Sequence, residues 1–124
     1  MGSWDNDPWG NDLAADWFGE FFGGLKANAR IKKAFKDRND LCVVRAACFI
    51  LGALGRVYVW PDDLDGLRPL LDQGIALLSR MVKPSEEDLE DDDFLEYWDD
   101  SPEYIKSVKA QIAELKKRRA EFPP

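Results

Sequence analysis

The 124-residue chain contains no histidine and only two cysteines. Without an imidazole group, the sequence excludes Ser-His-Asp and Cys-His catalysis and every histidine-ligated metal site. Two thiols are also too few for a four-cysteine zinc site. Hydrophobic residues make up 45% of the chain, which is enough to bury a core and argues against global disorder. We therefore expect one folded domain over residues 1–124, with no catalytic residue and no bound cofactor that the sequence identifies.

Basic residues are scarce and unevenly placed. The net charge is −7, and residues 61–100 hold fourteen acids against three bases. Residues 26–45 reverse this balance, with seven bases against two acids. A basic stretch of this size with a single aromatic residue, Phe35, is weak support for nucleic-acid binding, which we do not expect. The acidic balance indicates either a basic protein partner or simple solubility.

The sequence also lacks a long uncharged apolar run. The most apolar stretch, Leu41–Trp60, is interrupted by Arg45 and Arg56, so it predicts a buried core helix and not a membrane span. The first residues show no basic and apolar segments typical of a secretory signal. Cys42 and Cys48 are about 9 Å apart along one helix and are expected to be buried, unbridged thiols. Together these features predict a cytoplasmic protein.

Helical periodicity dominates the chain, and no segment alternates with period two. The fold class is therefore predicted to be all-α, a single domain of about five helices around a central apolar helix at 41–58. A turn-rich aromatic lead at 1–11 precedes the helices, and Ser101 and Pro102 are typical of the start of the last one. Pro69 is expected in the first turn of its helix, after a turn at 62–69. The other helices are expected over 12–22, 25–37, 69–82 and 102–119.

The expected first helix is amphipathic. Leu13, Trp17 and Phe21 share one apolar face, and we expect Trp17 to join Trp4 and Trp9 in the core. Acids also recur at helical spacing along it, and we interpret that row as a solvated face close to the basic second helix. The acids are Asp12, Asp16 and Glu20.

Residues 85–100 are the most distinctive segment, because ten of the sixteen are acidic and none is basic. A twelve-residue calcium loop beginning at Asp88 fits poorly, since its sixth position is Asp93 and not glycine. Two interpretations stay open: a solvated acidic loop, and a docking surface for a basic partner. The candidate partner-binding residues are Glu86, Glu87, Asp88, Glu90, Asp91, Asp92, Asp93, Glu96, Tyr97, Asp99 and Asp100.

The opening residues WDNDPWGNDLAADW resemble a small bacterial domain-of-unknown-function family, number 4259. The apolar helix VVRAACFILGALG, the helix PLLDQGIALLSRMV and the acidic segment ending in Leu-Glu-Tyr-Trp are similar to later parts of that family. The chain departs from it at Trp9-Gly10, where an aromatic-acid pair is commoner, and in the higher acidity of residues 85–100. The resemblance implies an all-helical fold and a bacterial cytoplasmic origin. It implies no activity.

Three function classes are compatible with the sequence. The first is a non-catalytic acidic protein-binding module, in its most concrete form an immunity-type inhibitor that binds a basic toxin or nuclease. The second is a structural or homo-oligomeric domain that uses the seam from Ile105 to Leu115 as its interface. The third is an enzyme that depends on carboxylates or a metal. We expect a monomer or homodimer that binds neither nucleic acid nor a membrane.

Overall fold

The computed structural model describes residues 12–122, and in this range every regular element is a helix. Five helices have ten or more residues, which confirms the predicted all-α domain of about five helices. Two further helices, of four and six residues, lie within the acidic segment. The bounds are α1 Asp12–Phe21, α2 Ala27–Lys36, α3 Leu41–Leu54, α4 Leu64–Val82, α5 Glu86–Leu89, α6 Asp92–Tyr97 and α7 Pro102–Arg119.

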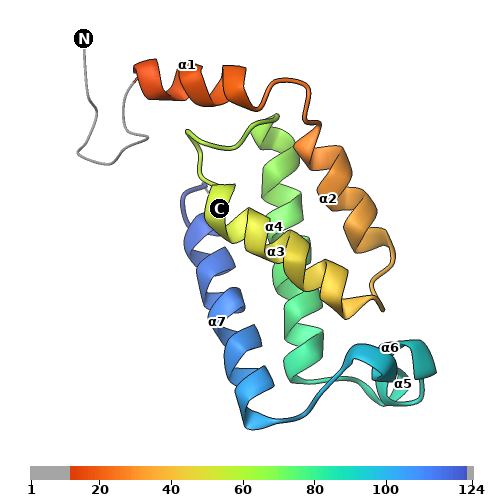
Figure 1. Ribbon diagram of the computed structural model, residues 1–124. Helices are drawn as coiled ribbons and strands as arrows, with labels where there is room; N and C mark the ends of the chain where they lie inside the picture. The colour runs from red at the N-terminus through yellow and green to blue at the C-terminus, as the bar shows by residue number, and fades with distance from the viewer. Residues whose placement is uncertain (1–11, 123–124) are drawn as a thin grey trace.

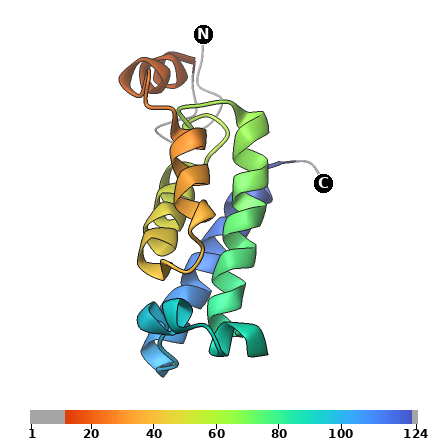
Figure 2. The same ribbon diagram turned by 90° about the vertical axis from the view of Figure 1, so that its right-hand side faces the viewer.

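The two longest helices, α4 and α7, form the most extensive contact of the bundle and run in opposite directions (Figures 1 and 2). Gly74 of α4 allows the close approach. A Cβ there would lie 2.9 Å from the Cδ1 of Leu115 and 3.3 Å from the Sγ of Cys48. Leu115 and Val108 of α7 are fully buried in the core. The predicted seam of the last helix therefore faces the inside of the domain and is not free to serve as an interface.

Helix α3 contacts α2, α4, α6 and α7, which confirms its central position. Val44, Cys48 and Leu51 on its inner face are almost completely buried. Its outer face is apolar as well, but the side chain of Phe49 is 66% exposed there and Cys42 is also exposed. The expectation that Cys42 is buried is therefore wrong: α3 is covered on one side only.

Helix α3 ends at Leu54, four residues before the predicted end. Gly55 closes it, and the chain then turns so that Trp60 is buried. The indole N–H of Trp60 donates to the Oδ1 of Asn28 at 2.7 Å. Burying this indole with its N–H donor satisfied stabilises the loop. The side chain of Asn28 thus ties this loop to α2.

Helix α4 begins at Leu64, and the predicted turn at 62–69 is wrong. Asp63 is the N-cap, since its carboxylate accepts from the backbone N–H of Asp65 at 3.0 Å. Pro69 lies inside the helix and has no backbone N–H to donate to the carbonyl of Asp65. Both residues are exposed, so water can replace that bond. The cap therefore sets the start of α4, and proline is tolerated in its second turn.

Helix α1 lies at one end of the molecule, outside the bundle formed by α2, α3, α4 and α7 (Figure 1). Its predicted apolar face forms but is not buried, because Leu13 is 81%, Trp17 56% and Phe21 65% exposed. The expectation that Trp17 belongs to the core is therefore wrong. Trp4 and Trp9 lie outside the described residues. In the described part of the chain, no helix combines the length and the apolar character needed to cross a bilayer.

Candidate protein-binding surface

The acidic segment is folded, and local caps explain how so many acids enter helices. Ser85 and Asp88 form a capping box at the start of α5, in which each side chain accepts from the other's backbone N–H. Asp91 caps α6, accepting from the backbone N–H groups of Asp93 and Phe94. The first turns of both helices are acidic, which matches the positive end of the helix dipole.

Two aromatic side chains attach this segment to the bundle. Phe94 of α6 is completely buried. Trp98 stacks on it with ring centroids 6.0 Å apart, and the indole N–H of Trp98 donates to the carbonyl of Met81 at 2.8 Å. These two rings thus dock α6 against the bundle. Leu95 remains 39% exposed.

Arg80, at the end of α4, is the polar anchor that sequence reasoning missed. Its Nε donates to the Oδ1 of Asp88 at 2.7 Å, and its Nη2 donates to the Oδ1 of Asn39 at 2.8 Å. The guanidinium carbon lies 4.6 Å from the centre of the Phe94 ring. Asn39 in turn donates to the Oδ2 of Asp91 at 2.8 Å. One arginine thus joins α4, α5, α6 and the loop after α2.

This network divides the predicted partner-binding residues into two groups. Asp88 and Asp91 are half-buried and bonded to Arg80 and Asn39, so they hold the segment in place. The remaining candidates are exposed, and within residues 12–122 none of their carboxylates pairs with a lysine or arginine. These exposed residues, called here the acidic surface, are Glu86, Glu87, Glu90, Asp92, Asp93, Glu96, Tyr97, Asp99 and Asp100.

One edge of the acidic surface is hollowed into a pocket of about 230 Å³ between α6 and the loop that joins α2 to α3. This acidic pocket contains four carboxylates, one amide and one phenol. The loop residues come from more than fifty positions earlier in the chain, and no sequence signal placed them beside α6. The lining residues are Asp37, Asn39, Asp40, Asp93, Glu96 and Tyr97.

The electrostatics of the pocket favour a cation. The negative charges of Glu96 and Asp40 raise the pKa of Tyr97 above its ordinary value, so the phenol stays protonated at neutral pH. Its ring is 39% exposed at the rim. A lysine or arginine side chain in this position would meet carboxylate acceptors, and it could also lie against an aromatic face. The chemistry of the pocket thus suits recognition of a basic side chain.

Acidification is expected to weaken the attachment of α5. Burial would raise the pKa of Asp88, but the hydrogen bonds from Ser85 and Arg80 outweigh it and lower that pKa. Asp88 therefore stabilises the fold above its unfolded pKa of about 3.9, and this contribution is lost as the pH falls through the lower folded value. The free energies of unfolding in urea of wild type and Asp88→Asn should differ most near neutral pH and converge as the pH falls below the folded pKa of Asp88.

The control for this experiment is Asp93→Asn, which removes an exposed carboxylate that is not bonded to Arg80. If the Asp93→Asn difference changed with pH as much as the Asp88→Asn difference, the ion pair with Arg80 would not be the cause.

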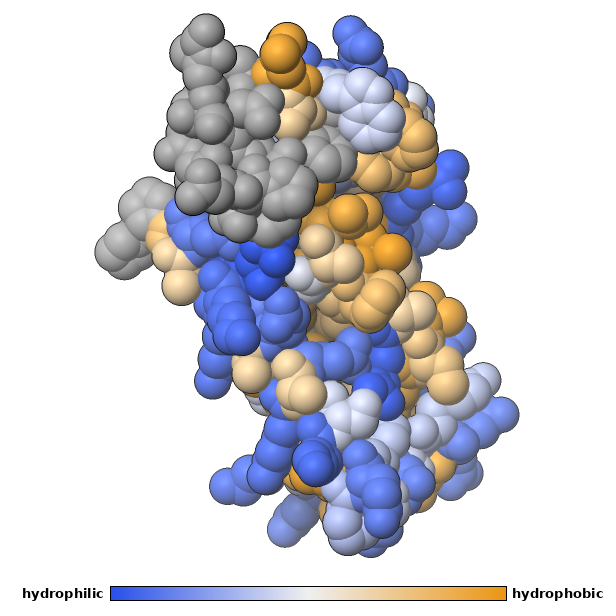
Figure 3. Space-filling view, turned by 60° about the vertical axis from the view of Figure 1, so that its left-hand side comes forward, coloured by the Kyte–Doolittle hydropathy of each residue, from blue (hydrophilic) through white to orange (hydrophobic). Residues whose placement is uncertain are grey.

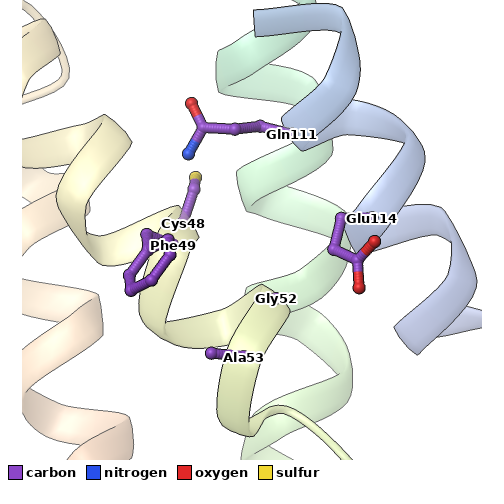
Figure 4. A pocket seen from close by; sticks show the side chains of 6 residues that line it. All are labelled: Cys48, Phe49, Gly52, Ala53, Gln111 and Glu114. Atoms are coloured by element: carbon purple, nitrogen blue, oxygen red, sulfur yellow. The ribbon is translucent and has the colours of Figure 1, made fainter. Parts of the chain in front are cut away.

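A second hollow lies between α3 and α7 (Figure 4). The amide of Gln111 points toward the thiol of Cys48, and Glu114 lies further along the same wall. Burial raises the pKa of Cys48 to about 12, so the sulfur stays a thiol and is a poor nucleophile at neutral pH. Gln111 is itself held by Arg45, whose Nε donates to it at 2.6 Å. This hollow offers no reactive group.

Within residues 12–122, no three acidic or sulfur side chains converge in an arrangement that holds a metal ion. Compared with known protein families, curated proteins and solved structures, the chain has no significant match in any of the three. The resemblance of its opening residues to the bacterial family therefore stays a prediction.

Proposed function

We propose that this protein is a non-catalytic binding module whose acidic surface docks a basic protein, and that it acts as an immunity-type inhibitor of a basic toxin or nuclease. The observation that carries the proposal is that α5 and α6 are anchored against the helical bundle. Phe94, Trp98 and Arg80 hold a segment rich in like charges rigidly against the bundle. Their anchoring presents the exposed carboxylates as a preformed surface.

Such a surface is costly for the isolated protein, because neighbouring carboxylates repel one another. A basic partner would relieve that repulsion and would be attracted over a long range. Electrostatic steering of this kind raises association rates well above about 10⁶ M⁻¹s⁻¹ at low salt. The same carboxylates could occupy the phosphate-binding cleft of a nuclease, where they would compete with its substrate. A cytoplasmic inhibitor of a basic enzyme would use both effects.

The acidic pocket gives the proposed contact its specificity. A flat acidic patch attracts any cation, whereas a pocket lined by four carboxylates and one phenol favours a single projecting lysine or arginine. Asp93 and Glu96 come from α6, and Asp37 and Asp40 come from the opposite wall. We therefore expect a basic side chain of the partner to be inserted beside Tyr97 as an anchor residue.

Charge reversal tests the proposal. We expect Asp93→Lys/Glu96→Lys to slow association with the basic partner about tenfold and to flatten its salt dependence. The matched control is Asp65→Lys/Glu103→Lys, which changes the net charge equally by reversing exposed acids of α4 and α7 outside the acidic surface. Tagged wild-type, test and control proteins would be used to capture partners from the host cell at two salt concentrations, and association rates would then be measured by stopped flow.

The proposal predicts one stoichiometric basic protein that is captured by wild type and control and is lost with the test variant. The toxic or nuclease activity of this basic protein should fall when wild type binds it. Capture that is equal for test and control variants would show that the acidic surface is not the interface. A protein that elutes only as a homodimer, with no separate partner, would favour the structural alternative.

A further inference from the structure

A second surface is formed by the outer faces of α2 and α3, and it meets the acidic pocket only at Asp37 and Asp40. A groove of about 710 Å³ lies between these helices. Its floor includes the small or apolar side chains of Ala29, Ala34 and Val43. Figure 3 views the molecule from the side away from α2, and it shows an orange band of apolar side chains across the middle of that side. On the outer face of α3, Ile50 is 40% and Phe49 is 66% exposed.

The rim of the groove carries positive charge over most of its length. Lys26, Arg30 and Lys33 line it on the α2 side. Asp37 and Asp40 lie only at the end near the loop. An occupant that fits this pattern is an amphipathic helix with an apolar stripe and acids beside it. The groove is therefore selective for a helix of negative charge.

Helix α1 has these properties. Leu13, Trp17 and Phe21 form its exposed apolar stripe, which spans about 12 Å along the helix axis. Asp16 and Glu20 lie beside the stripe at a spacing of one turn, and the sequence Asp12–Phe21 contains no base. Both the shape and the charge of α1 thus complement the groove.

The joint between α1 and α2 is suited to a change of direction. Gly24 has a φ of +81° and nothing within 4 Å of where a Cβ would stand. Lys26 has a φ of 55°, the left-handed region that a lysine rarely adopts. Five residues, 22–26, connect the helices, so α1 is held beside the groove at an effective concentration of about millimolar. The same chain therefore competes better for the groove than a second copy does.

We propose that α1 docks into the α2–α3 groove of its own chain as an antiparallel helical hairpin, in exchange with the arrangement seen here. In this register Glu20 faces Arg30, and one turn further from the joint Asp16 faces Lys33. Leu13, Trp17 and Phe21 then cover the apolar floor that includes Val43. The docked and undocked forms differ in whether the apolar faces of α1 and α3 are open to other molecules.

Crosslinking within the full chain tests this arrangement. In a Cys42→Ser background, Glu20→Cys/Arg30→Cys would be treated with bismaleimidoethane. The buried Cys48 thiol does not compete, because its pKa is raised to about 12. The control is Glu20→Cys/Lys32→Cys, whose cysteines are separated by a similar length of chain and whose second cysteine is exposed on α2 outside the groove. We expect the test pair to form an intramolecular crosslink at least about tenfold faster than the control. Equal rates, or crosslinked dimers alone, would overturn the proposal.

A charge swap tests the register separately. Asp16→Lys and Lys33→Glu should each slow the test crosslink about two- to fivefold, and the double variant should restore it. If the double variant did not restore the rate of the test crosslink, the pairing of Asp16 with Lys33 would be ruled out. Because neither substitution touches α5 or α6, these results are independent of the proposed partner.

Discussion

Replacing Phe94 with alanine is expected to lower the free energy of unfolding by about 3–4 kcal/mol. Phe94 is completely buried, and its ring contacts both the Trp98 ring and the Arg80 guanidinium. Truncation removes that apolar area and leaves a cavity under α6. The loss is a large share of the roughly 5–15 kcal/mol that stabilises a domain of this size. Urea unfolding followed by circular dichroism measures it.

The matched control is Phe49→Ala, the same substitution at a side chain that is 66% exposed. We expect it to cost less than about 1 kcal/mol. Amide hydrogen exchange adds a local readout, because Phe94→Ala should reduce protection in α5 and α6 more than in α4 or α7. If the two variants were equally stable, Phe94 would not anchor the acidic surface.

Replacing Arg80 with methionine is expected to cost about 2–3 kcal/mol, although methionine keeps much of the apolar stem. Stability is lost because the groups that accept hydrogen bonds from Arg80 are left without that donor. Asp88 loses its ion pair at 2.7 Å, and Asn39 and the carbonyl of Arg38 lose their donors. The Arg80 side chain is only 17% exposed, so solvent replaces these bonds incompletely. Thermal and urea unfolding both measure the loss.

Arg68→Met is the control for this variant, because Arg68 is an exposed arginine on the same helix. It should change the free energy of unfolding by less than about 0.5 kcal/mol. Adding Asp88→Asn to Arg80→Met should recover part of the lost stability, since it removes the unpaired charge. Strictly additive losses would contradict a direct coupling between Arg80 and Asp88.

Both substitutions also bear on the proposed function. The acidic surface depends on residues that carry no part of it: an aromatic ring inside the bundle and an arginine on α4. Weakening either anchor should slow partner binding even though every exposed carboxylate is still present. The solvated-loop interpretation predicts no such dependence, because an unattached acidic segment attracts cations without being fixed.

The sequence by itself determined the all-helical class, the five longer helices and most of their ends. Apolar residues at spacings of three and four, Ser101 before Pro102 and Asp40 before Leu41 are local signals, and local signals decide where a helix starts. The Ser85 to Asp88 spacing is also a capping-box pattern, and it could have predicted α5. The candidate acids were likewise visible as a run of like charge.

Only the tertiary structure decided which of those acids are free to bind and which are structural. Asp88 and Asp91 are chemically indistinguishable from their neighbours in the sequence, and they differ only because Arg80 and Asn39 come to lie against them. Only the tertiary structure brings Asp37 and Asp40 into the pocket wall. It also decides that the outer face of α3 is left uncovered. Periodicity predicts that a helix has an apolar face, but what covers that face depends on contacts between residues far apart in the chain.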